Sequence, residues 1–346
     1  MSVYERVLRP LLFRLSADQA HAAAQLALRT PLVWPLLGST CRVTDPRLEV
    51  DLAGIHLRNP VGMAPGFVKD GRVLRSVASL GFGYVTVGSF TRDARVGNPF
   101  PRLVRYPDRE AVANSLGMPN RGLMAAVSDL KSTRTDGCQV IASVAGFSAD
   151  ELLASARAVE PYVAAVEIGL VCPNTTETEK LEELRIFSSL AEALARSMRK
   201  PVFVKLPPHH TPEERHRTFA LLDECVRTGL QGVSVSGTRR HVEPGLSMGV
   251  GSIAGRPITE DSLRVVADVA DRSGGRLAIK AAGGVFSGSD VFRMLRAGAT
   301  CVEVYTSFIY RGWEVAGRLN RELLAVLNGT SVAALTRREP SAAVAS

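Results

Sequence analysis

Apolar residues recur from residue 61 onward in eight short runs of strand length. These runs are Val61–Ala64, Tyr84–Val87, Val140–Val144, Ala164–Ile168, Val202–Lys205, Val233–Ser236, Leu277–Lys280 and Val302–Val304. Between and after them, apolar residues at helical spacing predict helices over Arg121–Leu130, Ala149–Val159, Leu181–Met198, Pro212–Thr228, Thr259–Arg272, Asp290–Ala297 and Ala316–Leu327. Alternating strands and helices form a parallel sheet, and eight units predict a (β/α)8 TIM barrel of the α/β class. An open doubly wound sheet is the alternative, but Gly62–Gly66 does not have GxGxxG spacing.

The chain before the first run has the pattern of an N-terminal helical appendage. Helical spacing predicts helices over Tyr4–Leu15 and Ala17–Leu28, and Ser16 to Gln19 forms a capping box for the second. An apolar stripe runs along the first helix, with the arginines off that face, and comprises Val7, Leu8, Leu11, Leu12 and Leu15. This stripe can pack on the barrel or lie on a membrane surface, and the sequence leaves both roles open.

The domain organisation follows from these patterns. Pro31 and Pro35 are expected to end the helical segment. We therefore expect the appendage at residues 1–45, the barrel at residues 46–338 and a flexible tail at residues 339–346.

Composition narrows the class of protein. The chain has 346 residues, of which 46% are hydrophobic and 22% charged, and this suits one packed barrel domain. Five cysteines without CxxC or metal spacing indicate a reducing compartment, and no metal site is expected. The net charge of +8 suits an anionic ligand or a membrane surface, and without a recognition motif we expect no nucleic acid. No signal peptide or spanning apolar run is visible, so we expect a cytoplasmic protein or one bound peripherally to the inner face of the cell membrane.

Polar residues and glycines gather after the predicted strands, where barrel enzymes build their sites. They are Lys69 after the first strand, Ser89 after the second, Cys172 and Asn174 after the fourth, Lys205 ending the fifth, Ser236-Gly237-Thr238 after the sixth, Gly283-Gly284 after the seventh and Tyr305-Thr306 after the eighth. The glycine pair and the polar pair after it suit a phosphate group. Cys172 alone is interpreted as a small buried residue, but in this set it is a candidate base. The usual pKa of a thiol is about 8.5, and an electropositive site lowers it. Lys205 is expected to hold negative charge on a reduced flavin.

These motifs resemble the dihydroorotate dehydrogenase family over nearly the whole chain. The matching pieces include Gly66-Phe-Val-Lys-Asp-Gly71, Gly97-Asn-Pro-Phe-Pro-Arg-Leu103, Asn114-Ser-Leu-Gly-Met118, Cys172-Pro-Asn-Thr175, Gly255-Arg-Pro257 and Tyr305-Thr-Ser-Phe-Ile309. The helix pair is similar to that of the quinone-linked, membrane-associated branch, where it frames a quinone tunnel. The resemblance implies FMN at the barrel mouth, bound by Gly66, Lys69, Ser89, Ser143, Lys205, Ser236, Gly255, Gly284, Tyr305 and Thr306. It implies a small-molecule substrate bound by Lys69, Asn114, Ser115, Leu116, Gly117, Met118, Gly169, Asn174, Gly237 and Thr238, with a quinone or another electron acceptor.

The chain departs from the family pattern at several substrate positions. Cys172 stands where the quinone-linked branch has Ser, and Gly169 and Gly237 stand where the family has Asn. The family's Gly-Leu-Arg is replaced within Thr176–Glu179. An unpaired buried polar group costs about 1–3 kcal/mol, so two missing amides would weaken orotate recognition by roughly 2–6 kcal/mol. We predict that the two glycines open one shared pocket, with backbone necessity as the alternative reason for them.

The expected activity is FMN-dependent redox chemistry at a C–C bond next to a carbonyl. Cys172 would take the proton from the carbon beside the carbonyl, and hydride would pass from the neighbouring carbon to the flavin. Three functions stay open at this point: dihydroorotate oxidation with a quinone acceptor, redox chemistry on a different small carbonyl compound, and flavin binding without catalysis.

Overall fold

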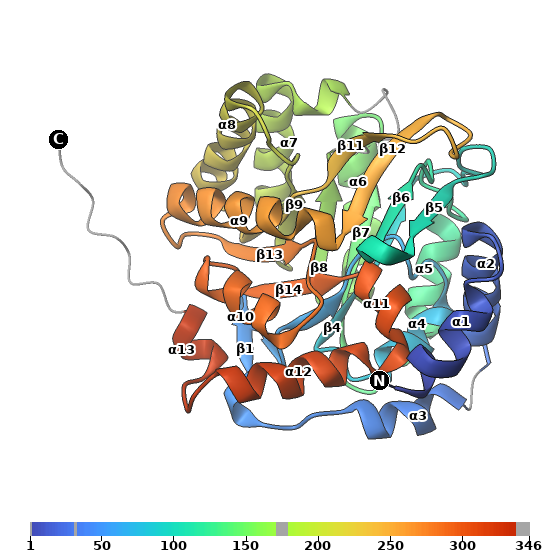
Figure 1. Ribbon diagram of the computed structural model, residues 1–346. Coiled ribbons are helices and arrows are strands. Elements are labelled where there is room, and N and C mark those ends of the chain that lie inside the picture. Colours follow the sequence, from blue (N-terminus) through green and yellow to red (C-terminus); the bar gives the residue numbers. More distant parts are fainter. Residues whose placement is uncertain (1, 31–32, 171–178, 337–346) are drawn as a thin grey trace.

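The computed structural model describes residues 2–30, 33–170 and 179–336 and is built around a closed barrel (Figure 1). Within these residues, eight parallel strands follow one another around the barrel: β3 (Val61–Met63), β4 (Tyr84–Phe90), β7 (Gln139–Ala145), β8 (Ala165–Gly169), β9 (Val202–Lys205), β10 (Gly232–Ser236), β13 (Ala278–Ala282) and β14 (Cys301–Val304). The barrel closes where β14 pairs with β3, with Val302 opposite Val61. Each predicted apolar run contributes one of these strands, so the TIM-barrel prediction is confirmed. The runs are almost continuously apolar because parallel barrel strands are covered on both faces.

Helices surround the barrel as an outer layer (Figure 1). They are α4 (Gly71–Ala78), α5 (Leu123–Ser132), α6 (Ala149–Val159), α7 (Leu184–Ser197), α8 (Pro212–Thr228), α9 (Thr259–Ser273), α10 (Gly288–Arg296) and α12 (Val315–Val326), with the short helices α11 (Thr306–Arg311) and α13 (Val332–Thr336). Local sequence fixes their ends. In α8, the Thr211 hydroxyl accepts from the N–H of Glu214 in a capping box, and Gly229 ends the helix at φ +76°.

The N-terminal appendage contains more helical pieces than predicted. A π-helical turn (Tyr4–Leu8) leads into α1 (Arg9–Leu12), and α2 (Ala17–Leu28) follows with the predicted Ser16–Gln19 capping box. The prediction of one helix to Leu15 is therefore wrong beyond Leu12. The prediction that Pro35 ends the segment is also wrong, because α3 (Val33–Cys41) contains it in its first turn, where the missing N–H costs no helix hydrogen bond.

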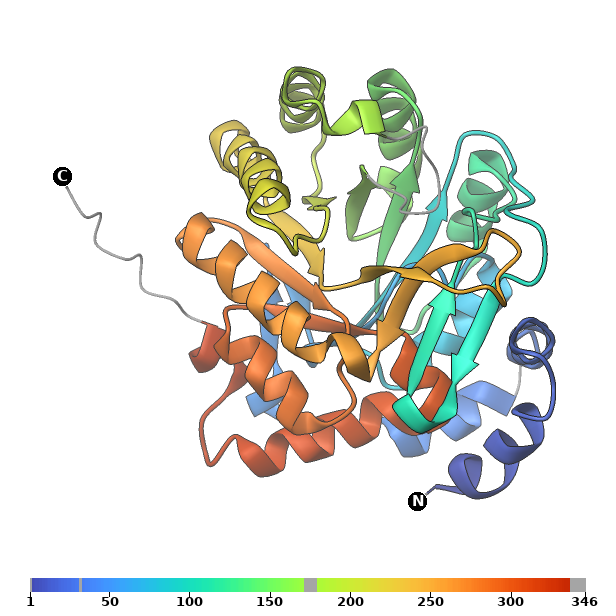
Figure 2. The same ribbon diagram turned by 45° about the horizontal axis from the view of Figure 1, so that its top comes forward.

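Two long connections build a second sheet that the sequence patterns did not predict. It is antiparallel, with the order β11 (Arg239–Val242), β12 (Val250–Gly255), β6 (Ala111–Asn114) and β5 (Leu103–Tyr106), and we call it the mouth sheet. Figure 2 shows it beside the barrel strands. A separate hairpin of β1 (Val50–Leu52) and β2 (Ile55–Leu57) precedes the barrel. Because the mouth sheet joins segments from after β4 and after β10, it encloses space at the carboxyl ends of the barrel strands.

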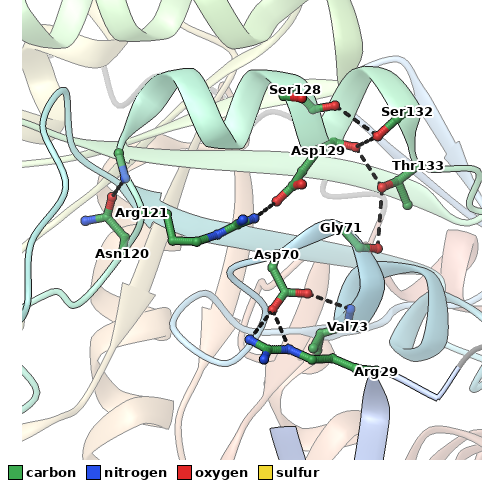
Figure 3. Close-up of polar contacts among 11 residues, drawn as sticks. Arg29, Asp70, Gly71, Val73, Asn120, Arg121, Ser128, Asp129, Ser132 and Thr133 are labelled. Carbon is green, nitrogen blue, oxygen red and sulfur yellow. Dashed lines mark hydrogen bonds and ion pairs between the residues drawn. The ribbon is translucent and has the colours of Figure 1, made fainter. Parts of the chain in front are cut away.

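Polar contacts attach α2 to the barrel and the mouth sheet. Arg29 pairs with Asp70, whose other carboxylate oxygen caps α4 (Figure 3). Gln25 donates to the carbonyl of Phe67 at 2.9 Å, and the Asp18 carboxylate accepts from the N–H of Arg102 at 2.9 Å. Figures 1 and 2 both place α2 at the side of the molecule near β5. No helix within the described ranges is both long enough and apolar enough to cross a bilayer.

Candidate active site

A cavity of about 280 Å³ lies between the carboxyl ends of the barrel strands and the mouth sheet. This is close to the lower end of the range for small-molecule sites, about 300–1,000 Å³. Its wall includes Leu103 and Val112 from the mouth sheet, and Leu206, Pro207 and Pro208 after β9. The enclosure is largely apolar, which strengthens the electrostatic effect of the few polar groups that face it.

The structure brings most of the predicted site residues to this cavity. Lining it are Gly66, Lys69, Ser89, Asn114, Leu116, Gly117, Met118, Gly169, Lys205, Ser236, Thr238, Gly255, Gly284, Tyr305 and Thr306. Ser143 does not line it, but its hydroxyl lies 2.8 Å from that of Ser89. Ser115 also lies behind the wall, and its hydroxyl accepts from the side-chain amide of Asn98 at 3.0 Å. Cys172, Asn174 and residues 176–178 lie outside the described residues.

Two lysines place positive charge at the cavity. Lys205 ends β9 and stands opposite Gly169 of β8 in the strand ladder. Lys69 follows β3, and its ammonium donates to the carbonyl of Pro119 at 2.8 Å. That bond ties Lys69 to the long connection that carries Asn114 to Met118. Lys69 and the loop that supplies the predicted substrate contacts are therefore held together.

The two unusual glycines occupy different environments. Neither has a positive φ, so backbone necessity explains neither. Gly169 lines the cavity, and a Cβ there would lie 3.3 Å from the carbonyl oxygen of Val144. Gly237 does not line the cavity, and a Cβ there would lie 2.4 Å from the backbone nitrogen of Ser262 at the start of α9. The prediction of a shared pocket is wrong for Gly237, because close packing against α9 requires glycine there.

Three buried ionisable side chains lie deeper in the barrel, and we call them the floor cluster: Lys280, Glu167 and Glu303. The Lys280 ammonium lies 2.7 Å from Glu167 Oε2 and 3.0 Å from Glu303 Oε1, and Thr86 Oγ1 donates to the same Glu303 oxygen at 2.6 Å. Both carboxylates line the cavity. Burial is the largest influence on both carboxyl groups and opposes their charges. At Glu167 the charges of Lys280 and Lys205 and the hydrogen bonds from Lys280 and Ser234 together outweigh it and lower the pKa, whereas at Glu303 burial and the charge of Glu167 raise the pKa.

The donors around the cavity fit FMN. The Ser307 hydroxyl is buried, lines the cavity and has no hydrogen-bond partner among the described residues, so it can donate to a phosphate. Gly66 and Gly284 have φ values of +108° and +76°, and they bring bare backbone to the cavity. Hydroxyls at Ser89 and Thr306 and the cation of Lys205 complete a set suited to an anionic, polar ring cofactor. No group of three or more potential metal ligands occurs in the part of the chain that the structure describes.

Sequence reasoning missed two kinds of lining residue. The first kind is the apolar residues of the mouth sheet and of Pro207-Pro208, because sequence reasoning considered only polar residues and glycines directly after predicted strands. The floor cluster did leave a signal, because Glu167 and Glu303 are carboxylates inside otherwise apolar strands. A buried carboxylate needs a partner, and Lys280 within the apolar β13 is a visible candidate.

Comparisons with known proteins agree with this geometry. The family model described as dihydroorotate dehydrogenase matches residues 47–327. The chain is 32% identical over 343 residues to a protein named dihydroorotate dehydrogenase (quinone) from a Roseiflexus species, covering 92% of each. It is 33% identical over 340 residues to a protein of that name from Thermus thermophilus, covering 94% of this chain and 97% of the relative. The crystal structure of ligand-free DHODH from Eimeria tenella is similar, with a TM-score of 0.81, 28% identity, and coverage of 93% of this chain and 99% of that one.

Proposed function

We propose, since this chain belongs to the dihydroorotate dehydrogenase family, that its substrate is dihydroorotate and that a quinone accepts its electrons. The chain is an FMN-dependent oxidoreductase that acts on a CH–CH group. The observation that carries the substrate proposal is one shared cavity. It is lined by Lys205 and the glycines suited to the cofactor, together with Lys69, Asn114, Leu116, Gly117 and Met118. Relatives named for the quinone reaction, which match over more than nine-tenths of the chain, support the acceptor.

The proposed mechanism assigns a role to each side chain. Bound FMN supplies a hydride acceptor. Cys172 takes the proton from the carbon beside the substrate carbonyl. Lys205 stabilises negative charge at the cavity wall, and Lys69 with Asn114 holds the substrate against it. The apolar wall from Leu103, Val112 and Pro207 excludes water from the reacting atoms.

Replacement of Cys172 tests the proposed base. Cys172→Ala should retain FMN, but its flavin reduction by dihydroorotate should be about 10²–10⁴-fold slower in rapid-mixing absorbance measurements, the usual contribution of a general base. Cys172→Ser is the matched variant, because it keeps a group that can accept the proton, and it should reduce faster than Cys172→Ala. Unchanged flavin reduction in Cys172→Ala would remove Cys172 as the base.

A second candidate substrate is supported by Gly169. This residue lines the cavity without a side chain, and a different small cyclic or unsaturated carbonyl compound could approach its backbone where an asparagine side chain would otherwise stand. Rescue of a pyrimidine auxotroph at normal expression supports dihydroorotate. Failure of rescue, together with rapid flavin reduction by another carbonyl compound, would support the second candidate.

We further propose that residues 1–45 act as a unit that docks on the inner face of the cell membrane and gives the quinone access, while residues 46–338 carry the chemistry; the tail expected at residues 339–346 lies outside the described residues. The exposed apolar side chains of the appendage support docking, because Leu11 is 52% and Leu36 is 73% exposed. Tyr4 is buried instead and donates to the carbonyl of Ile309 at 2.6 Å, so the appendage has separate faces for the barrel and for lipid.

Point substitutions test docking in the full chain. Leu11→Asp with Leu36→Asp should abolish sedimentation with anionic vesicles and lower turnover with a membrane quinone, but should spare turnover with a soluble dye. Val242→Asp is the control, because Val242 is 70% exposed on β11 of the mouth sheet and should leave sedimentation unchanged. Equal quinone turnover in the double variant and the control would refute the docking role.

A further inference from the structure

The floor cluster has no role in the chemistry described above. Its three side chains are at most 2% exposed and come from β8, β13 and β14. Glu167 stands two positions before Gly169 on β8, so it lies one layer below the residues that line the upper cavity. Glu167 and Glu303 still line the cavity, whereas Lys280 does not. The carboxylates therefore face the ligand space, and the lysine supports them from behind.

The Glu167 carboxylate is satisfied on one side only. Its Oε2 accepts from Lys280 Nζ at 2.7 Å and from Ser234 Oγ at 2.5 Å. Its Oε1 is buried and has no hydrogen-bond partner among the described residues. An unpaired buried carboxylate oxygen is costly to the fold, so its retention in the wall of a ligand cavity indicates a functional cause.

The charge of Glu167 is fixed, and it lies close to that of Lys205. Burial works against ionisation of Glu167, but Lys280 and then Lys205 lower its pKa. Glu303 is the opposite case, since burial and the neighbouring Glu167 raise its pKa. Glu167 therefore faces the cavity with the Lys280 ammonium behind it, and Lys205 presents a positive charge at the wall.

We propose that Glu167 lowers the reduction potential of the bound FMN, because it places a carboxylate in the wall of the cofactor cavity that offsets the positive charge of Lys205. A flavin gains negative charge as it is reduced, and in a largely apolar enclosure a fixed charge acts on that change over several ångströms. Glu167 thus holds the potential below the value that Lys205 alone would give. This role does not depend on which substrate or acceptor the enzyme uses.

Glu167→Gln tests the proposal on the full-length, FMN-loaded protein. The equilibrium between oxidised and reduced flavin is measured against reference dyes from its absorbance, without substrate. The variant should favour reduced flavin at least tenfold more than the wild type, which for a two-electron couple is a rise of about 30 mV. Glu303→Gln should change the equilibrium less than Glu167→Gln does, because the pKa of Glu303 is raised whereas that of Glu167 is lowered.

Tyr84→Phe is the structural control. The Tyr84 hydroxyl lies 3.0 Å from Cys301 Sγ inside the same barrel, and Tyr84 does not line the cavity. This variant removes a buried contact without changing charge, so its potential should equal that of the wild type. A shift in Tyr84→Phe as large as that in Glu167→Gln would show that barrel packing, and not charge, controls the potential, and would overturn the proposal.

A double variant covers the case in which Glu167→Gln does not fold because Lys280 loses its partner. Glu167→Gln with Lys280→Met removes both buried charges, which proteins tolerate better than a single unpaired one. Because Glu167 lines the cavity and Lys280 does not, the equilibrium should still move at least threefold toward reduced flavin. The proposal is overturned if the equilibrium between oxidised and reduced flavin changes less than twofold in Glu167→Gln, or in the double variant where only that one folds and retains FMN.

Discussion

Arg29 and Asp70 join the appendage to the helix start beside the cavity lysine. Arg29 Nε and Nη2 lie 3.2 and 2.9 Å from Asp70 Oδ2, while Asp70 Oδ1 accepts from the N–H of Val73 at 2.9 Å (Figure 3). One carboxylate therefore caps α4 and holds α2. Because Lys69 precedes Asp70 and lines the cavity, the position of α2 is coupled to the cavity wall.

The two halves of this contact should differ in their effect on stability. Arg29→Met removes a partly exposed ion pair and should cost about 0–1 kcal/mol of unfolding free energy. Asp70→Ala also removes the cap of α4 and should cost a further 0.5–2 kcal/mol, or roughly 1 kcal/mol as a central value. Urea unfolding measures both. Hydrogen exchange in α2 should become faster in Arg29→Met and Asp70→Ala, because both variants release this helix. Arg121→Met is the control and should leave the exchange unchanged, because the ion pair of Arg121 with Asp129 holds no part of the appendage (Figure 3). Equal losses for Arg29→Met and Asp70→Ala would contradict the double role of Asp70.

Asparagine should be tolerated at Gly169 and not at Gly237. In Gly169→Asn the new Cβ lies 3.3 Å from the Val144 carbonyl oxygen, which a small shift accommodates, and the variant should strengthen orotate binding by about 1–3 kcal/mol if the amide recovers a hydrogen bond. Gly237→Asn meets the backbone of Ser262 and should destabilise the fold by about 1–3 kcal/mol through overpacking. Thermal unfolding and orotate titration by flavin absorbance separate the two effects. A stable Gly237→Asn variant with improved orotate binding would restore the shared-pocket hypothesis.

His21 should make stability depend on pH. Burial, with a smaller contribution from the charge of Lys69, lowers its pKa from 6.5 to about 4. Between these two pH values the unfolded chain binds a proton at His21 that the folded protein does not bind. The contribution of His21 to the free energy of unfolding is therefore fully present above the pKa of the unfolded chain, and it is lost as the pH falls toward the pKa of the folded protein. Allowing for its partial exposure, we expect a loss of roughly 2 kcal/mol.

Urea unfolding at about pH 7.5 and about pH 4.5 checks this expectation, because the two conditions lie on either side of most of the titration. The difference in unfolding free energy between the two pH values should be smaller in His21→Gln than in the wild type by roughly 2 kcal/mol. His56→Gln serves as the control, since the His56 side chain is 69% exposed, and it should behave as the wild type does. An unchanged pH dependence in His21→Gln would assign the acid sensitivity to other groups.

The floor cluster should be far more sensitive to the loss of one member than to the loss of all three. Lys280→Met leaves a buried carboxylate without its cation and should cost about 3–5 kcal/mol in urea unfolding. Adding Glu167→Gln and Glu303→Gln removes the uncompensated charge and should recover most of that loss. A triple variant less stable than Lys280→Met would show that the carboxylates stabilise the barrel independently of the lysine.

The barrel was predictable from sequence because its signal is local. In Val202–Val204, strand length and unbroken apolar character follow directly from burial on both faces. The mouth sheet has no such signal. Its strand β11 is mostly exposed and charged, and the pairing of Ser252 with Asn114 joins segments far apart in the chain. No periodicity within either segment encodes that contact.

The site residues that directly follow barrel strands could be predicted from the sequence, because the carboxyl ends of these strands lie together at one end of the barrel. Lys205, Ser236 and Thr306 meet at one cavity because barrel topology brings all carboxyl ends together. Gly237 could not be judged in this way, because its environment depends on how closely α9 approaches β10. A missing side chain reads the same in a sequence whether it leaves space for a ligand or for a neighbouring helix.

The pairing of β14 with β3 gives this protein a demanding order of synthesis. Val61 leaves the ribosome early, but its partner Val302 is translated only near the end of the chain. One edge of β3 therefore has no native partner during most of translation, although β4 can already pair with its other edge. Such a long-range closure gives a high contact order and slow folding, and unpaired apolar strand edges in nascent chains are prone to aggregate. Soluble yield in a cell should accordingly rise when chaperones that bind the nascent chain are abundant.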